Sequence, residues 1–137
     1  MSFLLDTNVL SEVRKGTNCD ANVRRWWEST TSADFYLSVI VAGEIHRGIE
    51  KLMKTNPDMA RIFQSWLADL IREFGARVLP VNLVTAEIWG KISSNRTLPL
   101  ADGLLAATAL EHDLTFVTRN TKDIKGTGVR YLNPFED

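Results

Sequence analysis

Three acidic residues stand at the same kind of position in the chain, where an apolar segment meets a turn or the start of a helix. Asp6 follows the apolar run 3–5, which is too short for a stable helix and is typical of a buried strand. Glu44 opens the helix expected after a second apolar run, and Asp102 lies in the first turn of a helix that precedes a later strand. In an open parallel sheet such points meet at one edge, where ligands bind. Because crowded carboxylates repel one another, their convergence predicts a bound cation.

The chemistry of these side chains indicates which cation this is. Carboxylate oxygens are hard ligands, and such a site without cysteine selects Mg²⁺ or Mn²⁺. Each acid also has a simpler explanation, since Asp6 suits a turn and the other two suit the positive end of a helix dipole. Their joint occurrence at one sheet edge favours the metal site. Asn120 and Asp123, just past a strand expected at 114–118, are candidates for a fourth group.

The elements that position these acids alternate between strands and helices. Apolar runs rich in β-branched and aromatic residues predict strands at 3–5, 35–40, 77–81, 114–118 and 129–132. Helical spacing of apolar residues predicts helices at 9–14, 21–28, 41–53, 58–74, 83–93 and 101–111. Asn8 is the expected cap of the first helix, and Pro80 indicates that the third strand lies at an edge. The alternation predicts an α/β domain with a mainly parallel sheet of about five strands and helices on both faces.

The composition is that of an ordinary globular protein. The 137 residues suit one domain spanning 1–137, and the formal net charge of −1 argues against a strongly basic nucleic-acid binder. Positive charge for an anionic substrate must then come from a local basic patch or from metal ions. Cys19 is the single cysteine, which excludes an internal disulfide and fits a cytoplasmic location. We also expect no signal peptide and no membrane span, because the apolar stretches are too short.

Four blocks of the sequence carry a resemblance to a known family. They are residues 4–9 (LLDTNV), 37–45 (LSVIVAGEI), 101–109 (ADGLLAATA) and 117–123 (VTRNTKD). In this order and spacing they resemble the signature blocks of PIN-domain proteins, above all VapC-type toxins of bacterial toxin–antitoxin pairs, including the FitB-like branch. The resemblance implies a small α/β/α sandwich and an endoribonuclease that depends on Mg²⁺ or Mn²⁺. It also implies a homodimer that a cognate VapB-type antitoxin holds inactive.

The resemblance assigns roles to individual residues. Asp6, Glu44 and Asp102 match the metal-binding acids of the family, and the fourth acid, often Asp, falls at Asn120. A neutral side chain there leaves one negative charge fewer, so we expect one tightly held metal ion in the free protein rather than two. Asp123 compensates only if its turn directs it inward. The expected reaction is hydrolysis of RNA by a metal-activated water, and the resemblance implies products with 5′-phosphate and 3′-hydroxyl ends.

Other residues are candidates for contacts with RNA or with a partner. Thr7, Asn8 and Thr118 are placed to position water or the scissile phosphate, although the first two also suit helix caps. The basic residues near expected loops are Arg14, Lys15, Lys91, Arg96 and Arg119. The tryptophans on helices, expected mainly in core or partner contacts, are Trp26, Trp27, Trp66 and Trp89. The two helices within 41–74 carry much apolar material, which predicts a groove for an antitoxin helix.

Alternative functions meet specific objections in the sequence. His46 does not share a helix face with Glu44, and His112 suits a helix C-terminus, which argues against histidine-dependent cleavage through a cyclic phosphate. A phosphoacceptor receiver domain needs a paired acid after the first strand, but Asp6 is followed by Thr-Asn. A PIN-like module that only binds nucleic acid or protein stays open, because Asn120 replaces the fourth acid.

Overall fold

The structure, a computed structural model, describes residues 1–136 and contains a five-stranded sheet in the order β3-β2-β1-β4-β5. The strands are β1 (Phe3–Leu5), β2 (Phe35–Ser38), β3 (Val78–Leu79), β4 (Thr115–Val117) and β5 (Tyr131–Leu132). Every neighbouring pair of strands is parallel. Because β1 pairs with β2 on one side and β4 on the other, a residue that follows β1 lies at the middle of the carboxyl edge.

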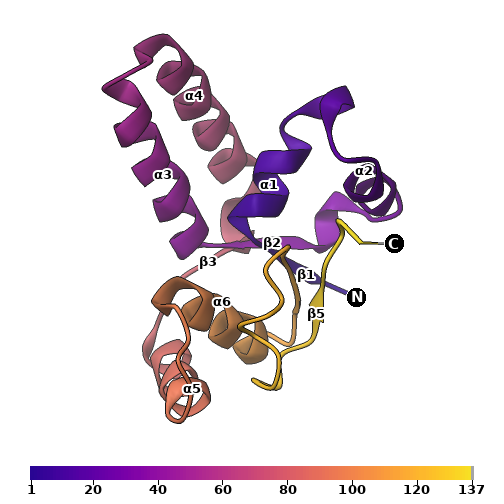
Figure 1. Ribbon diagram of the computed structural model, residues 1–137, viewed down its shortest axis with the longest axis vertical. Coiled ribbons are helices and arrows are strands. Elements are labelled where there is room, and N and C mark those ends of the chain that lie inside the picture. The colour runs from indigo at the N-terminus through magenta and orange to yellow at the C-terminus, as the bar shows by residue number, and fades with distance from the viewer. Residues whose placement is uncertain (137) are drawn as a thin grey trace.

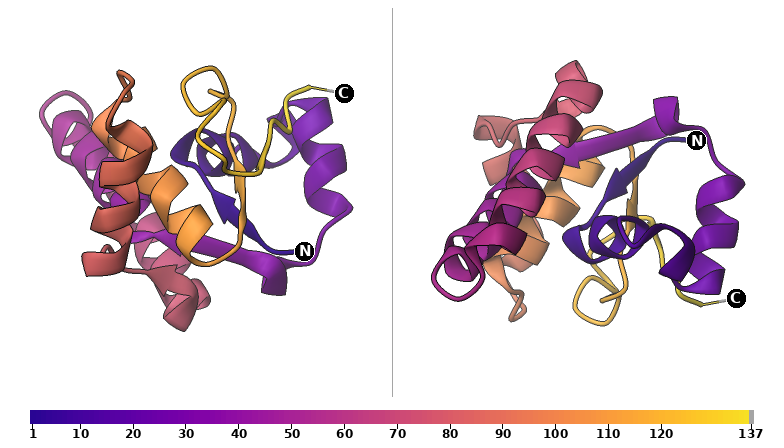
Figure 2. Two further views of the ribbon diagram at one scale, coloured as in Figure 1. Left: turned by 90° about the horizontal axis from the view of Figure 1, so that it is seen from below. Right: turned by 90° about the horizontal axis from the view of Figure 1, so that it is seen from above.

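Six α-helices within the described residues cover this sheet. They are α1 (Thr7–Val13), α2 (Ala21–Glu28), α3 (Val39–Met53), α4 (Pro57–Phe74), α5 (Leu83–Ser93) and α6 (Leu100–Glu111). Figure 1 shows α1 to α4 above the strands and α5 with α6 below them, which confirms the predicted α/β fold. The carboxyl ends of β1 and β2 point toward the hairpins α3–α4 and α5–α6, away from α2 (Figure 2). None of the helices within residues 1–136 is long and apolar enough to cross a membrane.

The central strands are buried on both faces. Leu4, Leu5, Phe116 and Val117 have exposed fractions of 1% or less. Parallel strands covered by helices on both sides read as continuous apolar runs rather than alternating ones, which is the pattern seen at 3–5 and 114–118. This buried pair of strands forms a rigid base for the side chains at their carboxyl ends.

Three local predictions are wrong. The second strand ends at Ser38 rather than residue 40, because the Ser38 hydroxyl accepts a hydrogen bond from the Ile40 backbone N–H (3.0 Å) and caps α3. As a result α3 begins at Val39, and Glu44 lies in its second turn rather than its first. Asp6, not Asn8, is the cap of α1, since the Asp6 side chain accepts from the Thr7 N–H.

Candidate active site

Asp6 lies at the centre of the candidate site, directly after β1, with only 6% of its surface exposed. Its Oδ1 accepts a hydrogen bond from the Thr7 backbone N–H (2.7 Å). Its Oδ2 accepts from the Thr118 hydroxyl (2.7 Å) and from the Asn8 amide (3.4 Å). Burial raises the pKa of Asp6 above its ordinary value and the charge of Glu44 adds to this effect, against the lowering effect of those hydrogen bonds. Hydrogen bonds therefore hold the carboxylate in place, and no positively charged side chain within residues 1–136 is among the groups that shift its pKa.

Glu44 is connected to Asp6 through the first residue of α1. The Thr7 hydroxyl donates a hydrogen bond to Glu44 Oε1 (2.8 Å), while the Thr7 backbone N–H binds Asp6. Glu44 itself is exposed on α3. Thr7, which the sequence made a candidate for binding water or phosphate, thus orients two acids at once.

Asp102 is the third acid and lies in the first turn of α6, as expected. It is half-buried, and none of the described residues donates a hydrogen bond to its carboxylate. Burial, followed by the charges of Asp6, Asp123 and Glu44, raises the pKa of Asp102 to about 6. The same carboxyl that a helix N-terminus would ordinarily favour in its charged form is therefore driven toward its neutral form.

The structure brings the three predicted acids into one electrostatic cluster. Their donor atoms are carboxylate oxygens, which fit Mg²⁺ or Mn²⁺ and lack the sulfur or imidazole ligands that softer metals favour. Within residues 1–136, no three Asp, Glu, His or Cys side chains are already gathered as direct ligands of one ion. Metal ions of this kind keep several water ligands. The chemistry of these oxygen donors therefore fits an ion of this kind whose remaining ligands are water.

Asn120 and Asp123 differ in how they relate to the acids. The backbone N–H of Asn120 donates to the Thr118 hydroxyl (3.1 Å), which in turn donates to Asp6. The Asn120 side chain is exposed, and no hydrogen bond to it is present among the described residues. Asp123 is half-buried, and its charge acts on Asp102. The fourth negative charge near the site thus comes from Asp123. The sequence left open whether this residue acts on the site.

Arg96, one of the basic residues proposed to contact RNA, has a structural role. Its two Nη atoms donate to the carbonyl oxygens of Lys125 and Gly126, each over 2.9 Å. These bonds join the loop between α5 and α6 to the loop that carries Asp123. The guanidinium is thereby committed to the protein's own backbone.

The other basic candidates differ in their surroundings. The Arg14 guanidinium lies 3.9 Å from the centroid of the Phe63 ring. The Arg119 guanidinium lies 4.6 Å from the Phe135 ring, and its backbone N–H donates to Asn8 Oδ1 (3.2 Å) beside Asp6. The remaining two, Lys15 and Lys91, are exposed. Arg119 is thus the basic residue whose backbone is tied most directly to the acidic site.

The aromatic and histidine side chains lie largely as expected. Trp26 and Trp27 join the core, where Trp27 stacks on Phe35 with ring centroids 4.5 Å apart. His46 and His112 each lie beside a neighbouring glutamate. Neither histidine is among the groups that shift the pKa of Asp6 or Asp102.

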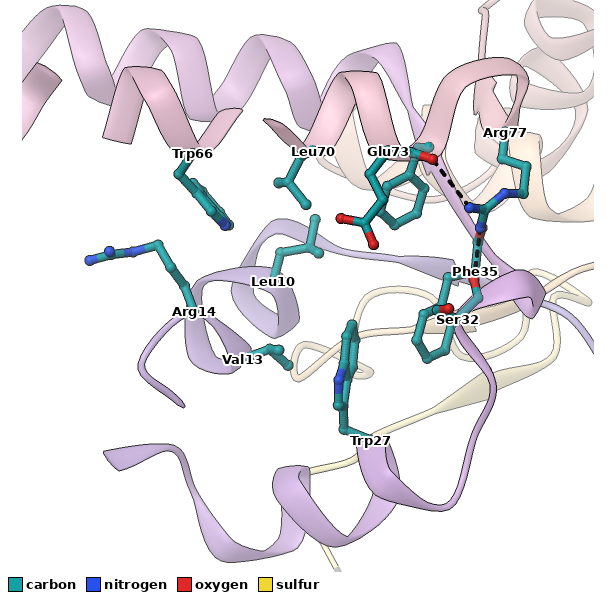
Figure 3. Close-up of a pocket in the computed structure, with 11 residues that line it drawn as sticks. Leu10, Val13, Arg14, Trp27, Ser32, Phe35, Trp66, Leu70, Glu73 and Arg77 are labelled. Atoms are coloured by element: carbon teal, nitrogen blue, oxygen red, sulfur yellow. Dashed lines mark hydrogen bonds between the residues drawn. The ribbon is translucent and has the colours of Figure 1, made fainter. Parts of the chain in front are cut away.

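A hollow of about 260 Å³ opens between α1, α2 and α4. Figure 3 shows Leu10 from α1, Trp27 from α2, and Trp66 with Leu70 from α4 around it. The carboxylate of Glu73 points into this space (Figure 3), and Arg14 and Arg77 line it as well. This first hollow uses α4 together with the N-terminal helices. The groove that the sequence predicted on the two long helices corresponds instead to a second hollow, which residues of both α3 and α4 line.

This second hollow, of about 240 Å³, lies between α1, α3 and α4. Thr7 and Glu44 line it, so it reaches the acidic site, and Ile49 and Phe63 provide apolar walls. Trp66 lines both hollows. The two spaces therefore adjoin along α4, from the surface near α2 to the acids.

Comparison with known proteins identifies similar sequences and folds. The sequence model of a family described as "PIN domain" matches residues 3–128. The chain is 36% identical to "Toxin FitB" of Neisseria gonorrhoeae, covering 98% of this chain and 99% of that protein. It is 30% identical to "VapC ribonuclease Y4jK" of Sinorhizobium fredii, over 98% of each chain. It also superposes on the crystal structure of FitAcB from Neisseria gonorrhoeae with a TM-score of 0.89 and 32% identity, covering 98% of this chain and 99% of that one.

Proposed function

This chain belongs to the PIN-domain family, among the VapC- and FitB-type toxins of toxin–antitoxin systems, and we propose that it hydrolyses RNA phosphodiester bonds. The observation that carries the proposal is the cluster of Asp6, Glu44 and Asp102 at one sheet edge, where burial and then the neighbouring negative charges raise the pKa of Asp6 and Asp102. Such an arrangement is costly unless a cation joins it. The names of two relatives, a toxin and a ribonuclease, agree with this chemistry. We further propose that the enzyme acts in the cytoplasm, where it meets RNA.

In this mechanism each acid has a defined task. Asp6, Glu44 and Asp102 would hold Mg²⁺ or Mn²⁺, and the ion would supply polarisation of the phosphoryl oxygen and a lowered pKa for the attacking water. Thr118 and Asn8 keep Asp6 oriented through hydrogen bonds, and Thr7 does the same for Glu44. Asn120 fixes Thr118 through its backbone N–H, and its amide oxygen is available as a neutral ligand. We propose that the negative charge of Asp123 adds to the attraction for the ion.

The chemistry of the product ends tests this function. Total bacterial RNA incubated with the purified chain and Mg²⁺ or Mn²⁺ should be cut, and EDTA should prevent the cutting. We expect 5′-phosphate and 3′-hydroxyl ends, which accept adaptors in a ligation without prior end repair, and sequencing those ends identifies the cut sites. RNA that stays intact with both ions, while still binding the protein, would support the PIN-like binding module instead.

We also propose that a cognate antitoxin inhibits the enzyme by occupying the two adjoining hollows on α4. The first hollow takes apolar side chains of the partner beside Trp27 and Leu70, and its charged lining residues, Arg14, Glu73 and Arg77, offer both signs of charge to polar groups of the partner. The second leads to Glu44, so a segment that crosses Trp66 reaches the acids. A basic side chain of the partner that reached Glu44 would supply positive charge in place of the metal ion. The enzyme is further proposed to be a homodimer, for which the exposed side chains of Leu83 (75%) and Leu100 (61%) are candidate contacts.

Trp66→Ala is expected to weaken antitoxin binding by about thirtyfold or more, because large aromatic side chains in interface pockets carry much of the binding energy. The product of the adjacent gene, co-expressed with each variant, is the partner to test by co-purification and by recovery of growth. Ile71→Ala is the matched control, since Ile71 lies exposed on the same helix and lines neither hollow. Equal co-purification with both variants would exclude the hollows as the binding site.

A further inference from the structure

The three acids of the site differ in what holds them. Asp6 accepts hydrogen bonds from Thr7, Asn8 and Thr118, and Glu44 accepts one from Thr7. Asp102 accepts none from the described residues. The position of its carboxylate therefore depends on how the first turn of α6 is packed.

The residue after Asp102 makes an unusually close contact with α5. A Cβ atom added to Gly103 would lie 2.8 Å from Cδ1 and 2.9 Å from Nε1 of Trp89, and 3.2 Å from Leu98. Distances under 3.0 Å are closer than real Cβ atoms approach, so the indole ring lies directly on the glycine. The ring thereby sets how near the first turn of α6 comes to α5.

The glycine at 103 is explained by this contact rather than by backbone conformation. Glycine in the middle of a helix is unfavourable relative to alanine because it loses more conformational freedom on folding. Gly43, Gly48 and Gly90 have no atom within 4 Å of the added Cβ, so alanine would fit at each. Gly103, in contrast, is buried and has no positive φ, and its missing side chain leaves the space that Trp89 occupies.

The indole of Trp89 is not placed by hydrogen bonding. Its Nε1 is buried and has no hydrogen-bond partner among the described residues. A buried donor without an acceptor is unfavourable, so packing against Gly103 must hold the ring in spite of it. The indole ring is therefore held by its packing against Gly103 and not by a hydrogen bond.

We propose that Trp89 is a positioning residue, whose indole ring on Gly103 fixes the first turn of α6 and so places the Asp102 carboxylate in the acidic site. The proposal rests on the proposed function, in which Asp102 is a ligand of the metal ion. Hydrogen bonds orient Asp6 and Glu44, whereas Asp102 is positioned by this steric contact instead. Trp89 acts through Asp102 and does not itself touch the reacting groups.

Gly103→Ala is expected to weaken Mn²⁺ binding by about tenfold, the lower end of the effect seen when the support of a metal ligand is removed. The added methyl group pushes the turn away from Trp89 and displaces Asp102. Trp89→Ala removes the ring atoms Cδ1 and Nε1 from the contact. It should weaken binding by only about threefold, less than the loss of a direct support, because it loosens the turn without displacing it. The double variant should return to the affinity of Trp89→Ala alone, because the methyl group at residue 103 then meets no indole atom. Calorimetric titration of the full chain with Mn²⁺ measures all of these affinities.

Gly90→Ala is the matched control, since its added methyl meets open space on α5, and it should bind Mn²⁺ like the wild type. Thermal unfolding without metal separates positioning from stability. If Gly103→Ala unfolds at a lower temperature yet binds Mn²⁺ normally, the contact is purely structural and the proposal is overturned. A double variant no better than Gly103→Ala overturns it as well. If Gly103→Ala does not fold, Trp89→Ala decides alone, and unchanged affinity in it overturns the proposal. A wild type that binds no Mn²⁺ instead overturns the proposed metal site, on which this inference depends.

Discussion

Asp6→Asn is expected to lower the rate of RNA cleavage by about a thousandfold, because it removes the most buried negative charge from the metal site. Asparagine is the informative replacement. It caps helices as well as aspartate does, so its side-chain oxygen can still accept from the Thr7 N–H. The Thr118 hydroxyl can turn to accept from the new amide. The fold is therefore retained while the charge is lost.

The measurement is the initial rate of cleavage with Mg²⁺ or Mn²⁺, together with cell growth after induction. Asp69→Asn is the matched control, since Asp69 is an exposed acid on α4 that pairs with Arg72. It should cleave RNA and arrest growth like the wild type. Full activity in Asp6→Asn would remove Asp6 from the catalytic site, even if the family membership stands.

The sequence reveals the three acids because each lies where an apolar segment ends. The strand before Asp6 is a continuous apolar run because it is buried on both faces, and that makes its end easy to locate. Parallel pairing then places the end of β1 between those of β2 and β4, so proximity follows from topology. In the same way, the first turn of α6 is where Asp102 was expected. For these residues, the local sequence pattern and the fold class together are sufficient to predict where in the fold each acid lies.

The contacts that orient the acids could not be predicted in this way. The Thr118 hydroxyl that binds Asp6 comes from 112 residues further along the chain, and its direction depends on the turn after β4. Asn8 and Asp6 are both good caps, and only the geometry at the end of β1 decides that Asp6 takes the role. Arg96 is a residue type that often contacts RNA, but its guanidinium donates to backbone carbonyl oxygens of the protein itself. The sequence alone does not reveal the close contact at Gly103, since Gly43 also lies inside a helix beside an acid and its added Cβ would meet open space.

Asp102→Asn should have two opposite effects, loss of cleavage and a gain in the stability of the metal-free protein. The pKa of Asp102 is raised to about 6 from an ordinary value of 3.8, first by burial and then by the charges of Asp6, Asp123 and Glu44. At pH 7 the folded protein therefore holds a carboxylate in a place that disfavours its charge. A neutral amide removes this cost. After allowance for screening by solvent at this half-buried group, we expect the free energy of unfolding to rise by about 1 to 2 kcal/mol.

The pH dependence of the metal-free wild type should have the same origin. Between about pH 4 and pH 6 the folded chain binds the Asp102 proton more tightly than the unfolded chain does, so the free energy of unfolding rises as the pH falls through this window. The raised pKa of Asp6 acts in the same direction. Urea unfolding at pH 7 and pH 4.5 in EDTA tests this, and Asp102→Asn should show a smaller difference between the two values. A wild type that instead loses stability by the same amount as Asp102→Asn on acidification would contradict it.

Asp58→Asn is the control that separates this effect from the helix dipole. Asp58, like Asp102, lies in the first turn of a helix, but it is exposed and pairs with Arg61 (3.0 Å). Its replacement should lower the free energy of unfolding, by about 0.3 to 1 kcal/mol, since a charge there favours the helix. Opposite signs for two acids in the first turn of a helix would show that burial and the neighbouring acids, not the helix dipole, set the energy of Asp102. Saturating Mn²⁺ should then reverse the order, stabilising the wild type and leaving Asp102→Asn almost unchanged, because the ion binds tightly only to the ionised site.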